Sequence, residues 1–167
     1  MTLKQRITPF LWFDGAAEAA ANFYVSIFDN SRIVAVSRSS DSGPGPKGAV
    51  MVVGFELDGQ EFSALNGGPM FKFTEAISMV VNCETQAEVD FYWAKLSAGG
   101  QEVQCGWLRD KFGLSWQIVP TELVVMMQDK DPAKTSRVMA AVMGMIKLDI
   151  AGLRQAFDGT AKPTAPK

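Results

Sequence analysis

The 167-residue sequence contains no histidine and only two cysteines. Without an imidazole, the chain cannot by itself form a histidine-based catalytic triad, a facial iron triad or a histidine-bound zinc site. Cys83 and Cys105 form neither a zinc-ligand pattern nor a disulfide framework, which is typical of a reducing compartment. Any functional site must therefore be built from other side chains.

The sequence also lacks an excess of one charge and any long hydrophobic run. Sixteen basic and eighteen acidic residues leave a net charge of −2, so we expect no nucleic-acid partner. The longest apolar runs, residues 49–53 and 123–127, are far too short to span a bilayer, so we expect no membrane association. No apolar signal segment follows the first residues, which together with the few cysteines predicts a cytoplasmic protein.

What is present is hydrophobic periodicity, with 47% hydrophobic residues to build a core. Alternation and β-branched or aromatic enrichment predict strands at residues 6–13, 31–39, 49–57, 60–65, 76–82, 101–108 and 114–119. Helical spacing predicts helices at residues 16–28, 85–97, 121–128, 133–145 and 149–157. The Asp58-Gly59 pair is typical of a two-residue hairpin turn. We expect an α+β fold.

Several helix ends have recognisable signals. Asp14 is the predicted N-cap of the first helix, and residues 85–88 read as a capping box. Asp131-Pro132 is a strong helix-start signal. Residues 121–157 are expected to form a C-terminal helical extension, and residues 158–167 a flexible tail.

The second half of the chain weakly repeats the first. A shift of 68 residues places Phe23-Tyr24 on Phe91-Tyr92 and Asp14 on Asn82. The matched stretch is strand, helix and strand in both copies. It predicts two copies of a β-α-β-β(-β) unit that bury their faces against each other, over about residues 6–68 and 75–120 of a single domain at residues 1–157.

Aromatic residues on the predicted strands are the main candidates for a ligand pocket. Taken singly, each of them is more typical of core packing, and the Asn66–Pro69 turn of a simple chain reversal. Alternation sets Gln117 opposite Trp116, so that one faces the helices and the other the open side of the sheet. An amide there could orient a ligand held mainly by apolar surface. The expected lining residues are Trp12, Asn66, Phe71, Trp107 and Gln117.

Other reactive side chains have simpler interpretations. Cys83 and Cys105 are expected to be small core residues, since no neighbouring cation is in place to form a thiolate. The methionines of the C-terminal helices favour core or dimer packing. Glu75 and Asp110 are the carboxylates at strand edges that could take part in chemistry.

Five segments together resemble a known family: ITPFLWFDG (7–15), NFY (22–24), LNGGP (65–69), CGWLRD (105–110) and GLSWQIVP (113–120). The chain is similar over nearly all of residues 6–157 to PhnB-like proteins. These are often labelled 3-demethylubiquinone-9 3-methyltransferase-like and belong to the vicinal oxygen chelate (glyoxalase/bleomycin-resistance/dioxygenase) superfamily. The resemblance implies two βαβββ modules forming a curled mixed sheet around a cavity, usually in a homodimer.

The resemblance also implies where a metal would bind. Superfamily enzymes hold a divalent metal with histidine and glutamate at four strand positions, which align here with Ile7 or Thr8, Asn66, Glu75 and Gln117. Neutral amides and one acid do not hold Zn²⁺, Fe²⁺ or Ni²⁺ tightly. We therefore expect no cofactor and no metal, Glu75 being the one weak candidate ligand.

The expected function is metal-independent binding of a small molecule of unknown identity. The alternative is an enzyme of the family, acting by methyl transfer or by lyase- or dioxygenase-type chemistry with a weak Mg²⁺ or Mn²⁺ site. No glycine-rich Gly-x-Gly-x-Gly turn for S-adenosylmethionine follows any predicted strand. A third possibility is an interaction role through the methionine-rich helices.

Overall fold

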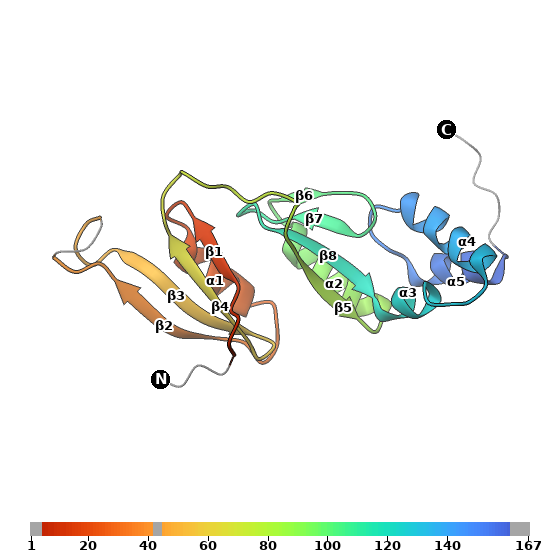
Figure 1. The fold of residues 1–167 in the computed structure, drawn as a ribbon, viewed down its shortest axis with the longest axis horizontal. Coiled ribbons are helices and arrows are strands. Elements are labelled where there is room, and N and C mark those ends of the chain that lie inside the picture. The colour runs from red at the N-terminus through yellow and green to blue at the C-terminus, as the bar shows by residue number, and fades with distance from the viewer. Residues whose placement is uncertain (1–4, 42–44, 161–167) are drawn as a thin grey trace. The chain divides into compact units, whose positions relative to one another are not determined.

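The computed structural model describes residues 5–41 and 45–160 of the chain. The chain divides into two compact units, with the boundary between Phe73 and Thr74. The first unit contains β1 (Phe10–Phe13), α1 (Ala17–Val25), β2 (Arg32–Arg38), β3 (Val50–Leu57) and β4 (Gln60–Asn66). These strands form a sheet of order β1-β4-β3-β2 in which β1 is parallel to β4 and the other pairs are antiparallel (Figure 1).

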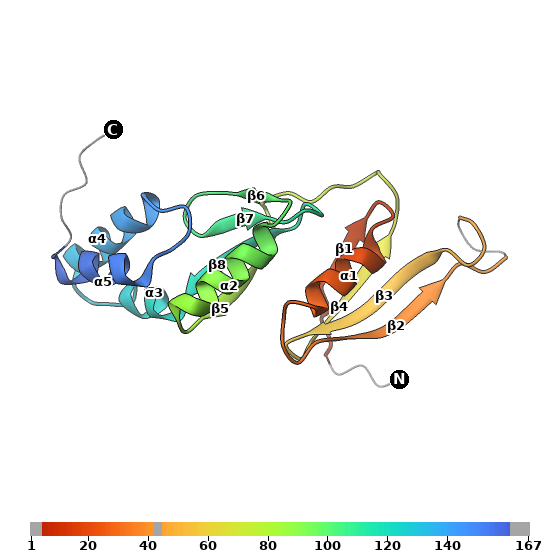
Figure 2. The ribbon, with the colours of Figure 1, turned by 180° about the vertical axis from the view of Figure 1, so that it is seen from behind.

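Helix α1 covers one face of the first sheet (Figure 2). Alternate strand residues face this helix and are at most 7% exposed: Leu11, Phe13, Val53, Phe55, Phe62 and Ala64. The helix meets them with three fully buried alanines and Tyr24, whose ring stacks on Phe55. Small residues bring the helix close to the sheet, so the core of this unit is thin and aromatic.

The second unit begins with β5 (Ser78–Cys83), α2 (Gln86–Ser97), β6 (Gln101–Glu102), β7 (Trp107–Arg109) and β8 (Ser115–Pro120). Its sheet has the order β5-β8-β7-β6, with β5 parallel to β8 and the remaining pairs antiparallel. Helix α2 covers the face that carries Leu108, Trp116 and Ile118 (Figure 2). Strand order and direction match the first unit element by element, which confirms the predicted repeat and the α+β class with two βαβββ modules.

Three helices follow the second module: α3 (Thr121–Met126), α4 (Pro132–Met143) and α5 (Ile150–Asp158). They share a small core of Met126, Val138, Val142, Leu148 and Leu153. The predicted helical extension is thus present. Asp158 ends α5, whereas it was expected in the tail, and residues 161–167 of that tail lie outside the described part of the chain. None of the helices in the described residues is long and apolar enough to cross a membrane.

Most local signals act as predicted. Asp58 and Gly59 both have positive φ, 46° and 78°, as the hairpin turn between β3 and β4 requires. The Thr85–Glu88 capping box forms with both of its hydrogen bonds, and the Asp131 carboxylate caps α4. Short-range sequence patterns therefore determine these element ends.

The prediction for the start of α1 is wrong. The N-cap is Ala16, not Asp14, and it makes no side-chain capping bond. The amide of Ala17 instead donates to the Asn66 side chain at 2.8 Å. A residue 49 positions away in the sequence replaces the local cap, which no local pattern could indicate.

Two predicted strands are also different in the structure. The strand expected at residues 6–13 starts only at Phe10, after Pro9, which has no amide hydrogen to donate. The single strand expected at residues 101–108 is instead the hairpin of β6 and β7. Its turn contains Cys105 and Gly106, both with positive φ (62° and 79°). The glycine indicates such a turn, but a cysteine at positive φ does not follow from its residue type.

Candidate functional site

Each sheet has a second face on which no helix of its own unit packs within the described residues. In the first unit this open face carries Phe10, Trp12, Ser63 and Leu65, because they alternate with the helix-facing residues. In the second unit it carries Trp107, Arg109, Ser115 and Gln117, together with Ser78 of β5. Four of the five predicted lining residues lie on these open faces or next to them, and Asn66 is the exception.

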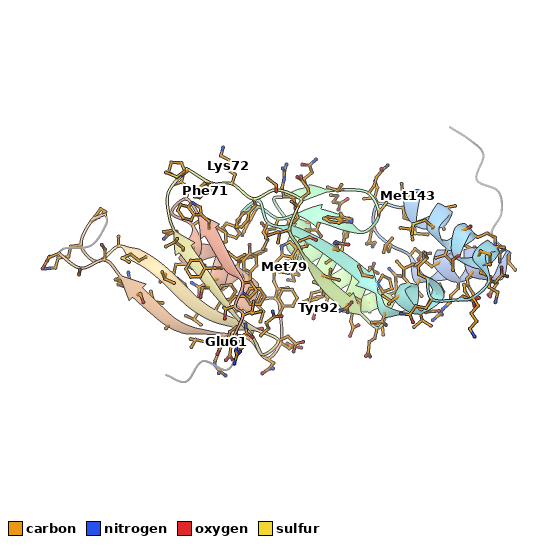
Figure 3. The ribbon with its side chains drawn as sticks, viewed as in Figure 1. Glu61, Phe71, Lys72, Met79, Tyr92 and Met143 are labelled. Carbon is orange, nitrogen blue, oxygen red and sulfur yellow. The ribbon has the colours of Figure 1, made fainter. Side chains whose placement is uncertain are left out.

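On the first unit, Trp12 and Phe71 form an aromatic pair. Their rings meet edge to face with centroids 4.9 Å apart, and Phe71 lies in the segment that follows β4 (Figure 3). The Trp12 indole N–H donates to the carbonyl of Gly68 at 2.8 Å. Trp12 is half-buried and Phe71 is 58% exposed. The pair thus combines a fixed indole with an accessible phenyl ring.

The two glycines after β4 pack against this indole. A Cβ at Gly67 would lie 2.3 Å from the Trp12 ring, a distance that real Cβ atoms do not reach. Gly68 has φ of +86°, a conformation that favours glycine. The Asn66–Pro69 turn is therefore more than a chain reversal, because it is shaped around Trp12.

Asn66 lies on the helix-facing side of β4, away from Trp12. Its Oδ1 accepts from the amide of Ala17 at 2.8 Å and its Nδ2 donates to the carbonyl of Val50 at 3.0 Å. Both ends of the amide are used inside the first unit, so a ligand would have to compete for them. Asn66 thus links β3, β4 and the start of α1.

On the second unit, Trp107 and Gln117 are direct neighbours across β7 and β8. The predicted alternation is confirmed, because Trp116 is buried against α2 while Gln117 is half-buried on the open face. Gln117 Nε2 donates to Ser78 Oγ at 2.8 Å. Its carbonyl oxygen bonds no residue of the described chain.

Trp107 differs from the other three tryptophans in its indole N–H. The indoles of Trp12, Trp93 and Trp116 donate to Gly68, Glu102 and Asp110 respectively, each at 2.8 Å. The half-buried Trp107 indole donates to no residue in the described part of the chain. An indole N–H usually finds a partner where it is shielded from water. The open face of β7 and β8 therefore presents a free donor and a free acceptor side by side.

Arg109 and Ser78 belong to the same face and were missed by the sequence reasoning. Arg109 follows Trp107 by two residues on β7, so both side chains leave the sheet on one side. That spacing was a usable signal, since Trp107 was already a candidate. Ser78 gave no signal, because only the parallel pairing of β5 with β8 brings it to Gln117.

Asp110 and Glu75, the two carboxylates predicted as candidates for chemistry, have different surroundings. Asp110 is 3% exposed and accepts from the amides of Phe112 and Leu114 and from the Trp116 indole. It holds the turn between β7 and β8 closed. Glu75 lies before β5 with its side chain 71% exposed, 4.0 Å from an Arg109 nitrogen.

The cysteines are both free thiols. Cys83 is fully buried, and burial, with a smaller contribution from the Glu88 charge, raises the pKa of its thiol to about 11. It therefore stays protonated and unreactive at neutral pH. Cys105 is half-buried, with its sulfur 3.7 Å from the Met143 sulfur.

The metal-ligand positions implied by the resemblance do not fit a transition metal. The Ile7 side chain has no donor atom, and its alternative Thr8 offers only a neutral hydroxyl that accepts from Gln5 at 3.5 Å. The two ends of the Asn66 amide are already bonded. Glu75 is exposed beside an arginine, and Gln117 is a neutral amide. Within residues 5–41 and 45–160, no three cysteine, aspartate or glutamate side chains come together. Such a donor set is poor for Zn²⁺, Fe²⁺ or Ni²⁺.

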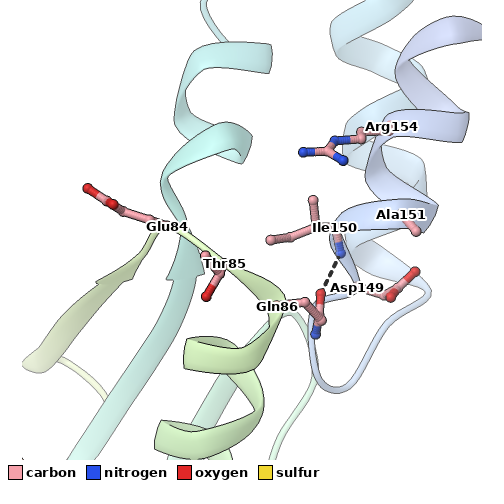
Figure 4. Close-up of a pocket in the computed structure, with 7 residues that line it drawn as sticks. All are labelled: Glu84, Thr85, Gln86, Asp149, Ile150, Ala151 and Arg154. Atoms are coloured by element: carbon pink, nitrogen blue, oxygen red, sulfur yellow. Dashed lines mark hydrogen bonds between the residues drawn. The ribbon is translucent and has the colours of Figure 1, made fainter.

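A pocket of about 320 Å³ lies elsewhere on the second unit, where α2 and α5 begin (Figure 4). Its polar groups are largely engaged by the fold. Gln86 accepts from the amide of Ile150, Asp149 caps α5, and Arg154 pairs with Glu122. The pocket is lined by Glu84, Thr85, Gln86, Asp149, Ile150, Ala151 and Arg154. The pocket is the junction between the starts of α2 and α5.

Comparison with solved structures identifies the fold. A PhnB protein from Bacillus cereus, provisionally described as a 3-demethylubiquinone-9 3-methyltransferase, is 43% identical and superposes with a TM-score of 0.65 over 70% of this chain and 100% of that chain. Protein PA1353 from Pseudomonas aeruginosa is 21% identical, with a TM-score of 0.58 over 70% and 98%. The fosfomycin resistance protein FosX from Listeria monocytogenes is 14% identical, with a TM-score of 0.54 over 77% and 100%. No curated protein matches the chain.

Two βαβββ modules of identical strand order are the fold that this chain shares with these structures, and this fold agrees with the expected vicinal oxygen chelate resemblance. The family model for 3-demethylubiquinone-9 3-methyltransferase matches residues 5–119. The chain belongs to this family. The match covers the two modules and ends before α3, so the helical extension lies outside it, although the resemblance was expected to reach residue 157.

Proposed function

We propose that the chain is a metal-independent small-molecule-binding protein that holds its ligand on the open face of the sheet of its second unit. The observation that carries this proposal is the Trp107–Gln117 pair. The two residues are cross-strand neighbours whose indole N–H and amide carbonyl bond no described residue. Binding sites combine apolar and aromatic surface with a few polar groups of this kind.

Trp12 and Phe71 form a separate candidate surface in the proposal, on the open face of the first unit. Their edge-to-face contact and the hydrogen bond from Trp12 to Gly68 hold the indole in one orientation, which lowers the conformational entropy lost on binding. Asn66 supports this surface by fixing the start of the glycine turn, rather than by offering a free amide.

The test is a metabolite panel read by tryptophan fluorescence and by melting temperature. We expect at least one compound to quench the fluorescence and raise the melting temperature. For that compound Gln117→Ala is expected to weaken binding about tenfold, as loss of one or two hydrogen bonds would. Gln104→Ala, which removes an exposed glutamine, is the matched control and should leave binding unchanged. A panel with no hit, or a hit indifferent to Gln117, would overturn the proposal.

Metal independence is a separate part of the proposal. It is supported by the neutral donors on the open faces. Binding should be the same with and without a chelator, and metal analysis after soaking in Zn²⁺ or Mn²⁺ should find less than one ion per chain. Binding that disappears with the chelator would contradict it.

The proposal also places the protein in the cytoplasm as a homodimer. Two free cysteines fit a reducing compartment, and the homodimer follows from the superfamily resemblance. Light scattering of the purified chain, whose monomer mass is 18.1 kDa, should give twice that mass. A monomer would remove this part of the proposal.

Methyl transfer is the second candidate, favoured by the description of the matched family. Against it, each sheet contains antiparallel pairs and differs from the doubly wound parallel sheet that commonly binds S-adenosylmethionine. Calorimetry with S-adenosylmethionine separates the two functions. Saturable binding would favour the methyltransferase, and the main proposal predicts no heat of binding.

A further inference from the structure

We infer that the ligand of the open face of the second unit carries a negatively charged group, a carboxylate or a phosphate, which Arg109 binds. This inference rests on the proposed function, because it specifies the chemistry of the same surface. Arg109 and Trp107 leave β7 on one side of the sheet, and Ser115 and Gln117 lie opposite them on β8. One cation, one indole and one amide therefore share a small area.

The Arg109 guanidinium has a single acidic partner in the described chain, and that partner is distant and exposed. One nitrogen donates to the neutral Gln101 side chain at 2.6 Å, and another lies 4.0 Å from the exposed Glu75 carboxylate. By contrast, Arg154 binds both oxygens of Glu122 at 2.7 Å, and Arg32 lies 2.8 Å from Glu56. The acidic partner of Arg109 is thus farther away than those of Arg154 and Arg32.

The acidic groups nearest in sequence are directed elsewhere. Asp110 is buried and binds the Trp116 indole on the helix-facing side. Glu102 accepts from Trp93 of α2 and pairs in register with the helix-facing Leu108. Among the acidic residues that the structure describes, only Glu75, from the segment before β5, approaches the guanidinium.

Gln101 holds Arg109 in place while leaving further N–H groups available. A guanidinium fixed at one nitrogen can still offer the forked donors that match a carboxylate or phosphate. The neighbouring Trp107 ring can take a flat apolar body, and Gln117 a hydroxyl or amide group. The ligand class is therefore a planar or apolar molecule with one acidic group.

Matched pairs of probes test the inference. Each pair is an aromatic carboxylate and its neutral amide, for example 2-naphthoate and 2-naphthamide, with naphthyl phosphate added as a second acid. Affinities come from tryptophan quenching of the full chain at low salt. We expect the acids to bind at least tenfold more tightly than the amides, and raised salt to reduce this preference.

Two variants localise the charge effect. Arg109→Gln should weaken acid binding about tenfold and leave amide binding unchanged, while Arg109→Lys should recover part of the loss. Lys130→Gln removes the same charge from an exposed lysine of the second unit and should have no effect. Unchanged melting temperatures would show that the variants fold.

The outcomes separate the two proposals. Equal affinity for acids and amides, or acid binding indifferent to Arg109→Gln, would overturn this inference while leaving small-molecule binding intact. Failure of every probe and of the metabolite panel would overturn the proposed function and this inference together.

Discussion

At the scale of single residues, two amide side chains that were both predicted to contact a ligand have different roles in the structure. Asn66 looked like a ligand contact because it is an amide at the end of a strand. The structure instead joins it to the amide of Ala17 and the carbonyl of Val50. The amide ends of Gln117 are divided differently, since one bonds Ser78 and the other is free. Residue type alone therefore does not distinguish a structural amide from a binding one.

Replacing Asn66 by alanine should lower the free energy of unfolding by about 1–2 kcal/mol. The change removes the only side-chain bond to the first amide of α1 and leaves the Val50 carbonyl without its donor. Urea denaturation measures the effect. Asn82→Ala, at an exposed asparagine, should change the stability by less than about 0.5 kcal/mol. Equal stability of the two variants would show that Asn66 does not cap the helix.

Gly67→Ala should destabilise the chain by about 1–3 kcal/mol, because the added Cβ would lie 2.3 Å from the Trp12 ring and force it to move. Gly54→Ala is the control, since its added Cβ would find its nearest atom at 3.9 Å. Thermal unfolding and the NMR signal of the Trp12 indole N–H report the change. A shifted indole signal is expected for Gly67→Ala alone, and an unmoved one would contradict the packing described.

At the scale of elements, the helical extension is attached to the second module by backbone and side-chain bonds. The amides of Cys105 and Gly106 donate to the carbonyls of Met145 and Ile146. Gln86, the first residue of α2, donates to the carbonyl of Leu148 and accepts from the amide of Ile150. A single side chain thus joins the start of α2 to the start of α5, which explains why these helix ends meet at the pocket in Figure 4.

Gln86→Ala should loosen the extension before it affects the rest of the unit. The variant loses two hydrogen bonds to the extension and one to the exposed Asp90. Loss of the two bonds to the extension is expected to cost about 1–2 kcal/mol. Hydrogen exchange of the Ile150 amide should accelerate, because its acceptor is gone. Gln104→Ala removes an exposed glutamine of the same unit and is expected to leave this exchange rate unchanged. Unaltered exchange in both variants would mean that the backbone bonds alone fasten the helices.

At the scale of the whole molecule, two units share one plan but pack different side chains. The shift of 68 residues aligns β1 with β5 and α1 with α2. The aligned tyrosines do not fill equivalent core positions, since Tyr24 is fully buried whereas Tyr92 is half-buried and its neighbour Trp93 lies in the core. The two units therefore share their strand order but differ in the side chains that form their cores. This difference explains why the sequence repeat is weak.

Global stability should fall in acid through two carboxylates. The hydrogen bond from Arg154 lowers the pKa of Glu122 below its ordinary 4.5, and the hydrogen bond from Lys147 lowers the pKa of Asp90 below 3.8. A lowered folded pKa gives stability that is complete above the ordinary pKa and is lost as pH falls through the lowered value. Both carboxylates face solvent, so the effect is small and is screened by salt.

Urea unfolding between pH 7 and pH 3 measures this dependence. The unfolding free energy should decline below about pH 4.5, and Glu122→Gln should make the decline shallower. Glu84→Gln, an exposed glutamate whose carboxylate bonds no described residue, should leave the slope as it is. The same slope for Glu122→Gln and the natural chain would rule out a contribution from this ion pair.

The sequence by itself determined the class of the fold, the two modules and most helix ends. The physical reason is that hydrophobic period, the Asp58-Gly59 turn, the Thr85–Glu88 capping box and Asp131-Pro132 act over a few residues. The family motifs added the mixed parallel and antiparallel pairing of the strands, which periodicity does not contain.

Only the tertiary structure decided which side chains of different strands share a face and which polar atoms stay free. Two examples join residues about 50 positions apart: the hydrogen bond from Ala17 to Asn66 and the packing of Gly67 against Trp12. The meeting of Ser78 with Gln117 depends on parallel pairing across 39 residues. Such contacts arise from the packing of whole strands and helices, and the open face with Trp107, Arg109 and Gln117 is their product.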